Sequence, residues 1–185
     1  MIKKIFAAVG LVTLGVLGRT VFDLPPNVEL VTLSCLLASV YLGGGFSVLV
    51  PLAIMVVSDM AIGNTQIFIF TWSAYIVVGL SALILRRCKK NNVNLVSAST
   101  LFTIPTSLFF YLWTNFGVWY QGWYPPTLSG LTESYVMGLP FLKFNLVGNL
   151  IFVPLGFGLI AVVRQLILSS TGSVLPLGKV HNMLK

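Results

Sequence analysis

The stretch that decides the fold is residues 66–86, QIFIFTWSAYIVVGLSALILR, which is followed at once by RCKK at 87–90. About twenty mostly apolar residues are enough for one α-helix to cross the hydrocarbon layer of a membrane. Lys and Arg collect at the cytoplasmic ends of such helices. The stretch therefore predicts a membrane-spanning helix whose C-terminal end lies inside the cell.

The rest of the chain has the same character. Of its 185 residues 57% are hydrophobic and 8% are charged, which is the composition of an integral membrane protein. We expect an all-α integral membrane fold, a compact bundle of six transmembrane helices at 5–19, 28–43, 46–61, 66–86, 95–113 and 145–164. A less apolar helix at 127–142 is expected as an extra outer element, lying in the interface or re-entering the membrane. Residues 1–168 would form a single domain and 169–185 a cytoplasmic tail.

The charged residues divide between the two ends of these spans. Nine of the eleven Lys and Arg residues fall at one set of ends, whereas the four acidic residues fall at the other set with Arg19 and Lys143. The positive-inside rule then predicts a multi-pass protein of the inner or plasma membrane, with both termini in the cytoplasm. The basic residues are scattered over span ends, which argues against nucleic-acid binding. Polar groups that are costly to place near the hydrocarbon layer gather on the outer side, which indicates a binding site there.

Four charged residues are candidates for that outer site: Arg19, Glu29, Asp59 and Glu133. Glu29 follows Asn27, a candidate helix N-cap, and a carboxylate in the first turn of a helix is stabilising without any function. The alternative is that Glu29 belongs to the rim of a binding cavity. Asp59 lies in an apolar span, where an ionisable group is a functional candidate. A structural pair with Arg19, or a cap on the turn at Gly63, is the competing interpretation.

Aromatic and amide side chains supply further candidates. Nine aromatic residues fall between Phe109 and Tyr124, as an interfacial belt or as a stacking wall for a flat ligand. If that segment is helical, Asn115, Trp119 and Trp123 share one face. Asn145 and Asn149 stand four residues apart near the start of the last span, where buried amides hold helices together or contact a ligand.

The residue inventory argues against an enzyme. The only histidine, His181, lies in the C-terminal tail, so a serine–histidine pair within the bundle is excluded. No cluster of His, Cys and carboxylate suggests a metal site, and no glycine loop is followed by the lysine of a phosphate-binding motif. We expect no catalytic residue, no metal and no cofactor, and the chain cannot hydrolyse ATP by itself.

Several motifs resemble those of small membrane proteins similar to the S components of energy-coupling-factor (ECF) transporters. They are PPNVELVT at 25–32, the stretch 50–59, TNFGVW at 114–119, YPPTLSGL at 124–131, YVMGLPF at 135–141 and NLVGNL at 145–150. The resemblance covers roughly residues 20–160. It implies a six-helix protein that binds a vitamin-like micronutrient in an outward-facing cavity. It also implies as partners a transmembrane coupling subunit and cytoplasmic ATPases.

The family often docks its coupling subunit through a four-residue alanine repeat on the first helix. The first span here lacks that repeat, but Ala8 and Gly15 are small and share a face. Two functions therefore compete. The first is the substrate-binding subunit of a micronutrient uptake transporter; the second is a structural or scaffold membrane protein of an envelope complex with no ligand. An outer pocket filled by side chains would favour the second.

Overall fold

The computed structural model describes residues 1–22, 27–28, 30–63, 67–89 and 91–172, and these are almost entirely helical, with no β-strand. The elements are α1 (Ile2–Thr20), α2 (Val31–Leu37) with its π-helical continuation η1 (Ala38–Leu42), α3 (Phe46–Ile62), α4 (Phe68–Ser81) with its 3-10 continuation η2 (Ala82–Cys88), α5 (Asn92–Tyr120) and α6 (Leu128–Gly172). The expected all-α class is confirmed.

Three helical segments are long and apolar enough to cross a membrane: Phe68–Cys88, Asn92–Tyr120 and Leu128–Ser169. The apolar segments Val31–Leu42 and Phe46–Ile62 are shorter than a typical span. The helices are compatible with a membrane protein.

The segment formed by α2 and η1 is the centre of the structure. Every residue of α2 is buried, because α1, α3, α4 and α6 all pack against it. A helix that is apolar on all sides must be enclosed in this way. One polar side chain of this segment ties it to a neighbouring helix: the Ser39 hydroxyl donates to the carbonyl oxygens of Cys35 at 2.8 Å and Gly79 at 2.6 Å. The second bond joins η1 to α4.

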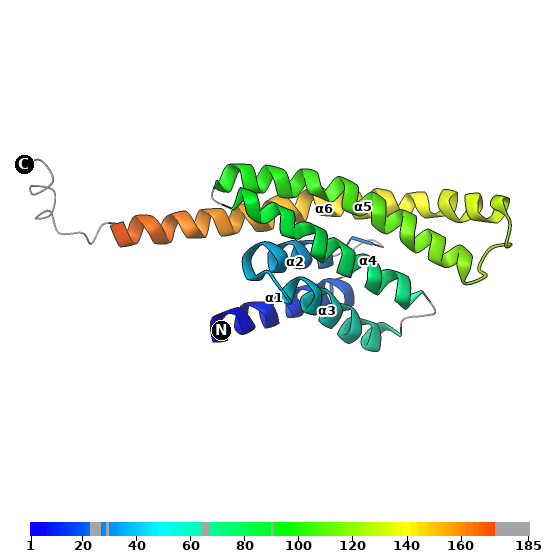
Figure 1. Ribbon diagram of the computed structural model, residues 1–185, viewed down its shortest axis with the longest axis horizontal. Helices are drawn as coiled ribbons and strands as arrows, with labels where there is room; N and C mark the ends of the chain where they lie inside the picture. Colours follow the sequence, from blue (N-terminus) through cyan, green and yellow to red (C-terminus); the bar gives the residue numbers. More distant parts are fainter. Residues whose placement is uncertain (23–26, 29, 64–66, 90, 173–185) are drawn as a thin grey trace, which may run out of the picture.

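Helices α5 and α6 form a long antiparallel pair along one side of the bundle (Figure 1). The separate outer helix expected at 127–142 is wrong, because these residues form the first part of α6, which is one helix of 45 residues. Pro140 and Pro154 lie inside it. Each proline removes one backbone hydrogen bond, and neighbouring helices commonly stabilise membrane helices through such positions. Here α5 packs along α6 and plays that role.

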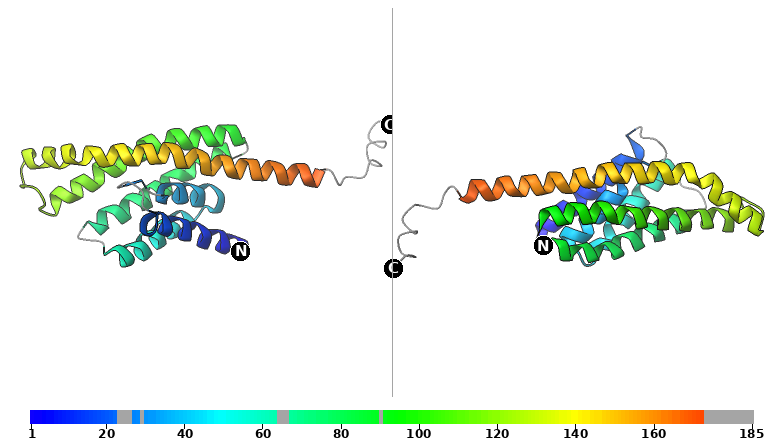
Figure 2. Two further views of the ribbon diagram at one scale, coloured as in Figure 1. Left: turned by 180° about the vertical axis from the view of Figure 1, so that it is seen from behind. Right: turned by 90° about the horizontal axis from the view of Figure 1, so that it is seen from above.

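The two ends of the structure differ in charge. The N-terminus and the C-terminal end of α6 lie at the same end of the molecule (Figures 1 and 2). The described basic residues Lys3, Lys4, Arg86, Arg87, Lys89 and Arg164 belong to that end, which we call the basic end. Arg19, Asp59, Glu133 and Lys143 belong to the opposite half, where the connection between α5 and α6 lies.

Candidate ligand-binding cavity

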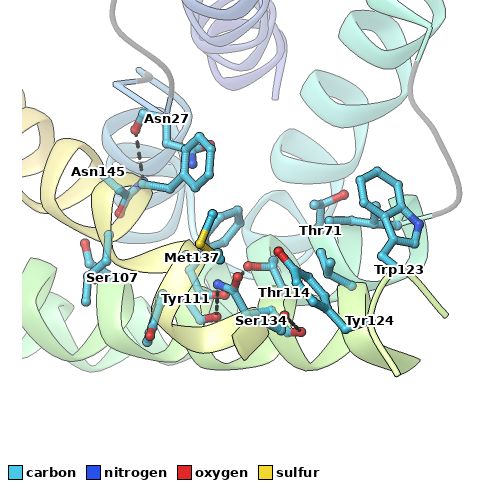
Figure 3. A pocket seen from close by; sticks show the side chains of 17 residues that line it. Asn27, Thr71, Ser107, Tyr111, Thr114, Trp123, Tyr124, Ser134, Met137 and Asn145 are labelled. Carbon is cyan, nitrogen blue, oxygen red and sulfur yellow. Dashed lines mark hydrogen bonds between the residues drawn. The ribbon is translucent and has the colours of Figure 1, made fainter. Parts of the chain in front are cut away.

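A cavity of about 360 Å³ lies in the half of the molecule opposite the basic end (Figure 3). The first turn of α4, the C-terminal half of α5 and the N-terminal third of α6 form its walls. Its lining residues are Asn27, Ile67, Thr71, Ser107, Phe110, Tyr111, Thr114, Asn115, Val118, Trp123, Tyr124, Ser134, Met137, Gly138, Phe141, Leu142 and Asn145. Small-molecule sites in proteins begin at about 300 Å³, so the cavity is large enough for a ligand.

Polar contacts between α5 and α6 fix the longest wall of the cavity. The Tyr111 hydroxyl donates to the backbone carbonyl of Tyr135 at 2.6 Å, and the Ser134 hydroxyl donates to the carbonyl of Asn115 at 2.8 Å. Gly138 faces the Asn115 side chain so closely that a Cβ atom would overlap the amide. The glycine thus lets the Asn115 amide lie between the two helices. Side chains on this wall are therefore held in place before any ligand binds.

A chain of amides closes one end of the cavity. The Asn149 amide donates to the Ser107 hydroxyl and to Asn145 Oδ1, both at 3.0 Å. Asn145 Nδ2 in turn donates to the carbonyl of Asn27 at 3.3 Å, a bond drawn in Figure 3. Asn149 is buried and does not line the cavity, so it positions Asn145, which does.

The described lining residues of the cavity are neutral. They carry hydroxyl, phenol and amide groups among aromatic and aliphatic side chains, and none of these described residues is Asp, Glu, Lys, Arg or His. Figure 3 shows Asn145 and Asn27 at one end and Trp123 with Tyr124 at the other. These side chains can donate and accept hydrogen bonds and stack against a ring, but within the described part of the chain they offer no charge with which to balance an ionised ligand.

Three of the predicted ligand-binding residues line this cavity: Asn115, Trp123 and Asn145. Trp119 does not. Helix α5 ends at Tyr120, so the expectation that Trp119 and Trp123 share one helical face is wrong. The Trp119 indole donates to the Pro125 carbonyl at 2.9 Å and borders a second, more open depression with Trp123.

The three predicted charged residues that the structure describes lie outside the cavity lining. Arg19 and Asp59 form an ion pair at 2.8 Å with side chains only 10% and 6% exposed. Glu133 is exposed on α6, and Glu29 lies outside the described residues. Asn27 does not cap the next helix as expected, since α2 begins at Val31 with Leu30 at the N-cap position.

The Arg19–Asp59 pair belongs to a network that joins three helices. Arg19 Nη1 also donates to the Ser58 hydroxyl at 2.6 Å, and the Trp72 indole donates to Asp59 Oδ2 at 2.6 Å. We call these four residues the α1–α3–α4 clamp. Of the two interpretations of Asp59, the structural pair with Arg19 is the one the geometry supports.

The first helix uses its small residues for packing within the chain. Gly15 is buried, and a Cβ atom there would overlap the Ile54 side chain of α3. Gly15 therefore serves packing of α1 against α3 within the chain. Close approach of α1 to α3 also brings Arg19 to Asp59.

Within the residues that the structure describes, fold and cavity together define an all-helical protein with three helices long and apolar enough to cross a membrane and a cavity in one half whose described lining is neutral. A family of unknown function (DUF6580) matches residues 1–171, and because this is most of the sequence, the chain belongs to that family. No curated protein and no solved structure matches the chain.

Proposed function

We propose that the chain is an integral membrane protein that binds a small neutral molecule from outside the cell, as the substrate-binding subunit of an ECF-type micronutrient transporter. The observation that carries the proposal is the cavity itself. Side chains do not fill it, hydrogen bonds between α5 and α6 hold Tyr111, Ser134 and Ser107 in place, and its lining offers rings and amides together. A scaffold protein needs no such space.

The charges along α6 support the membrane placement. Lys143 and Arg164 stand 21 residues apart in one helix. At 1.5 Å per residue this is about 31 Å, which is the thickness of the hydrocarbon layer. The segment between them would cross the membrane, with the basic end in the cytoplasm according to the positive-inside rule. Asn145 and the cavity would then lie at the outer boundary of the hydrocarbon layer, open to ligand from outside.

The lining indicates the class of ligand. Burying an unpaired charge is costly, so a cavity whose described lining residues carry no charge favours an uncharged ligand. Trp123, Tyr124 and Phe110 suit a planar ring, and the amides of Asn115 and Asn145 suit a hydrogen-bonding edge. A neutral heterocycle of vitamin size has these properties. Energy for release into the cell would come from a coupling subunit and cytoplasmic ATPases, since the sequence contains no phosphate-binding glycine loop.

A ligand-free scaffold protein is the second candidate. The α1–α3–α4 clamp favours it, because the most strongly polar part of the predicted site holds helices together instead of lining a cavity. The clamp is equally useful to a binding protein, which needs rigid walls, so it does not outweigh the open cavity.

Native mass spectrometry of the purified protein tests the proposal. We expect a co-purified neutral molecule in the parent protein and much less of it in a Met137→Trp variant, in which the larger side chain would occupy the cavity. A matched Val136→Trp variant places a tryptophan at the neighbouring position of α6, which is similarly exposed but does not line the cavity, and should keep the molecule. No bound molecule from native membranes, or equal loss in both variants, would contradict the proposal.

A further inference from the structure

Four basic side chains from three helical elements converge at the basic end, around the C-terminal end of η1. Lys4 Nζ from α1 donates to the Leu42 carbonyl at 3.2 Å, and the Arg86 guanidinium lies against Gly43. Lys89 Nζ lies over the Tyr41 ring at 5.0 Å from its centroid. Arg164 from α6 is near enough for its charge to act on Lys89 and Tyr41. We call Lys4, Arg86, Lys89 and Arg164 the basic cluster.

The electrostatics of Lys89 show that these charges act on one another. Burial first, and then the positive charges of Arg86, Arg164 and Lys4, lower the pKa of the Lys89 ammonium. The side chains are therefore close enough to repel one another, although they belong to segments far apart in the sequence. Such an arrangement favours an anion between them.

The described part of the chain supplies little negative charge to this cluster. Asp59 is paired with Arg19 in the other half, and Glu133 is 31 residues from Arg164 along α6, about 46 Å away in a straight helix. The carbonyl end of a helix such as η1 is equivalent to roughly half a negative charge. Four positive charges exceed that amount several-fold, so capping of the helix end accounts for only part of the cluster.

The depth of the basic cluster in the membrane determines which anions can reach it. Arg164 marks one end of the α6 segment whose length equals the hydrocarbon thickness, so the cluster lies at the level of lipid headgroups. Basic groups between helices at the cytoplasmic surface are suited to anionic lipid headgroups. Arg86 and Arg164 are exposed, so a headgroup can reach them from the lipid side.

We propose that the basic cluster binds the phosphate of an anionic phospholipid in the cytoplasmic leaflet. This site is separate from the cavity and shares with the proposed function only the placement of the chain in a membrane. Lys4 and Lys89 would stay near the helix ends, whereas the guanidinium groups of Arg86 and Arg164 would make bidentate contacts with the phosphate oxygens.

Lipid binding to the full-length protein tests this proposal. Phosphatidylglycerol and phosphatidylcholine with the same acyl chains are titrated separately, and the bound fraction is measured by native mass spectrometry. We expect preference for phosphatidylglycerol, and about fivefold weaker binding of that lipid for each of Arg86→Gln and Arg164→Gln. Arg87→Gln is the matched control, since Arg87 is an exposed neighbour outside the cluster and its loss should change little.

Three results would overturn the proposal. The first is equal binding of the two lipids, and the second is the same loss in Arg87→Gln as in Arg164→Gln, which would mean general surface attraction. In the third, millimolar inorganic phosphate displaces phosphatidylglycerol completely, as expected for a site that takes a free anion. None of these results depends on the cavity. A failure to find a ligand in the cavity leaves lipid selectivity unaffected, and a failure of lipid selectivity leaves ligand binding in the cavity unaffected.

Discussion

Asp59 in α3 accepts a hydrogen bond from the indole nitrogen of Trp72 in α4, at 2.6 Å. Its other carboxylate oxygen accepts from Arg19 in α1, so one carboxylate joins three helices. The bond to Trp72 also fixes the residue next to Thr71, which lines the cavity. The clamp thus affects the cavity through the position of α4, without touching it.

We expect Asp59→Leu to lower thermal stability strongly, because it removes the carboxylate that forms the buried ion pair with Arg19. Breaking a buried ion pair on one side typically costs about 3–5 kcal/mol. Unfolding of the detergent-solubilised protein, followed by intrinsic fluorescence, measures the effect. The Arg19→Leu/Asp59→Leu double variant should recover much of the loss, and Glu133→Gln, at an exposed position, should unfold like the parent. A stable Asp59→Leu variant would show that the clamp contributes little.

Asn145 and Asn149 should separate ligand contact from support. Asn145→Ala should reduce affinity for the co-purified molecule about two- to tenfold, the value of one hydrogen bond. Asn149→Ala removes the donor to the Ser107 hydroxyl and to Asn145 Oδ1 and should cost roughly 1–3 kcal/mol of stability. Ligand occupancy by native mass spectrometry and thermal unfolding are measured for both. If neither variant loses ligand, the amide chain serves helix packing alone.

Trp123 should report on the ligand through its fluorescence. Because its side chain lines the cavity and Trp119 is bonded to Pro125, a stacking ligand should quench Trp123. Quenching on adding back the co-purified molecule should disappear in Trp123→Phe and persist in Trp119→Phe and Trp72→Phe. Equal quenching in all three variants would mean that the aromatic residues form an interfacial belt without a stacking role.

Gly138→Ala should disturb the wall between α5 and α6, since the added Cβ atom would overlap the Asn115 amide. Overpacking of this kind typically costs about 1–3 kcal/mol. Thermal unfolding checks this, and the Gly138→Ala/Asn115→Ala double variant should regain stability, because the shorter side chain removes the overlap. Gly158→Ala is the control, since a Cβ atom there meets nothing within 4 Å.

The topology can be tested with a membrane-impermeant thiol reagent on intact cells. Cys88 adjoins the basic end and should stay unlabelled until the membrane is permeabilised. A cysteine replacing the exposed Thr127, at the opposite end, should be labelled directly. The reverse pattern would invert the proposed orientation.

Much of the fold could be predicted because apolar runs and basic residues mark helix positions directly. The segment 66–86 corresponds closely to α4 and η2. The continuity of α6 could not be predicted, because Pro140 and Lys143 resemble a helix end and only packing against α5 shows otherwise. A proline in isolation indicates a break, whereas tertiary contacts decide whether one forms.

The candidate site was predicted in part. Asn115, Trp123 and Asn145 were found because amides and aromatic residues at a span end are unusual. Trp119 was misplaced because the end of α5 depends on Gly122, whose left-handed backbone (φ 81°) turns the chain away. Thr71, Ser107 and Thr114 were missed. Hydroxyl residues in helices commonly bond to their own backbone, as Thr114 does to Phe110, so the sequence gives no signal of a cavity lining.

The unbroken run of α6 has a mechanical consequence. Asn145 at the cavity and Arg164 at the basic end stand on the same helix, 19 residues apart, with no loop between them. A rotation or tilt imposed at one end must reach the other as a rigid displacement, except where Pro154 lacks a backbone donor and allows bending. If the cavity binds a ligand, its occupancy would be coupled through α6 to the position of Arg164, and bending at Pro154 would set how much of the movement is transmitted.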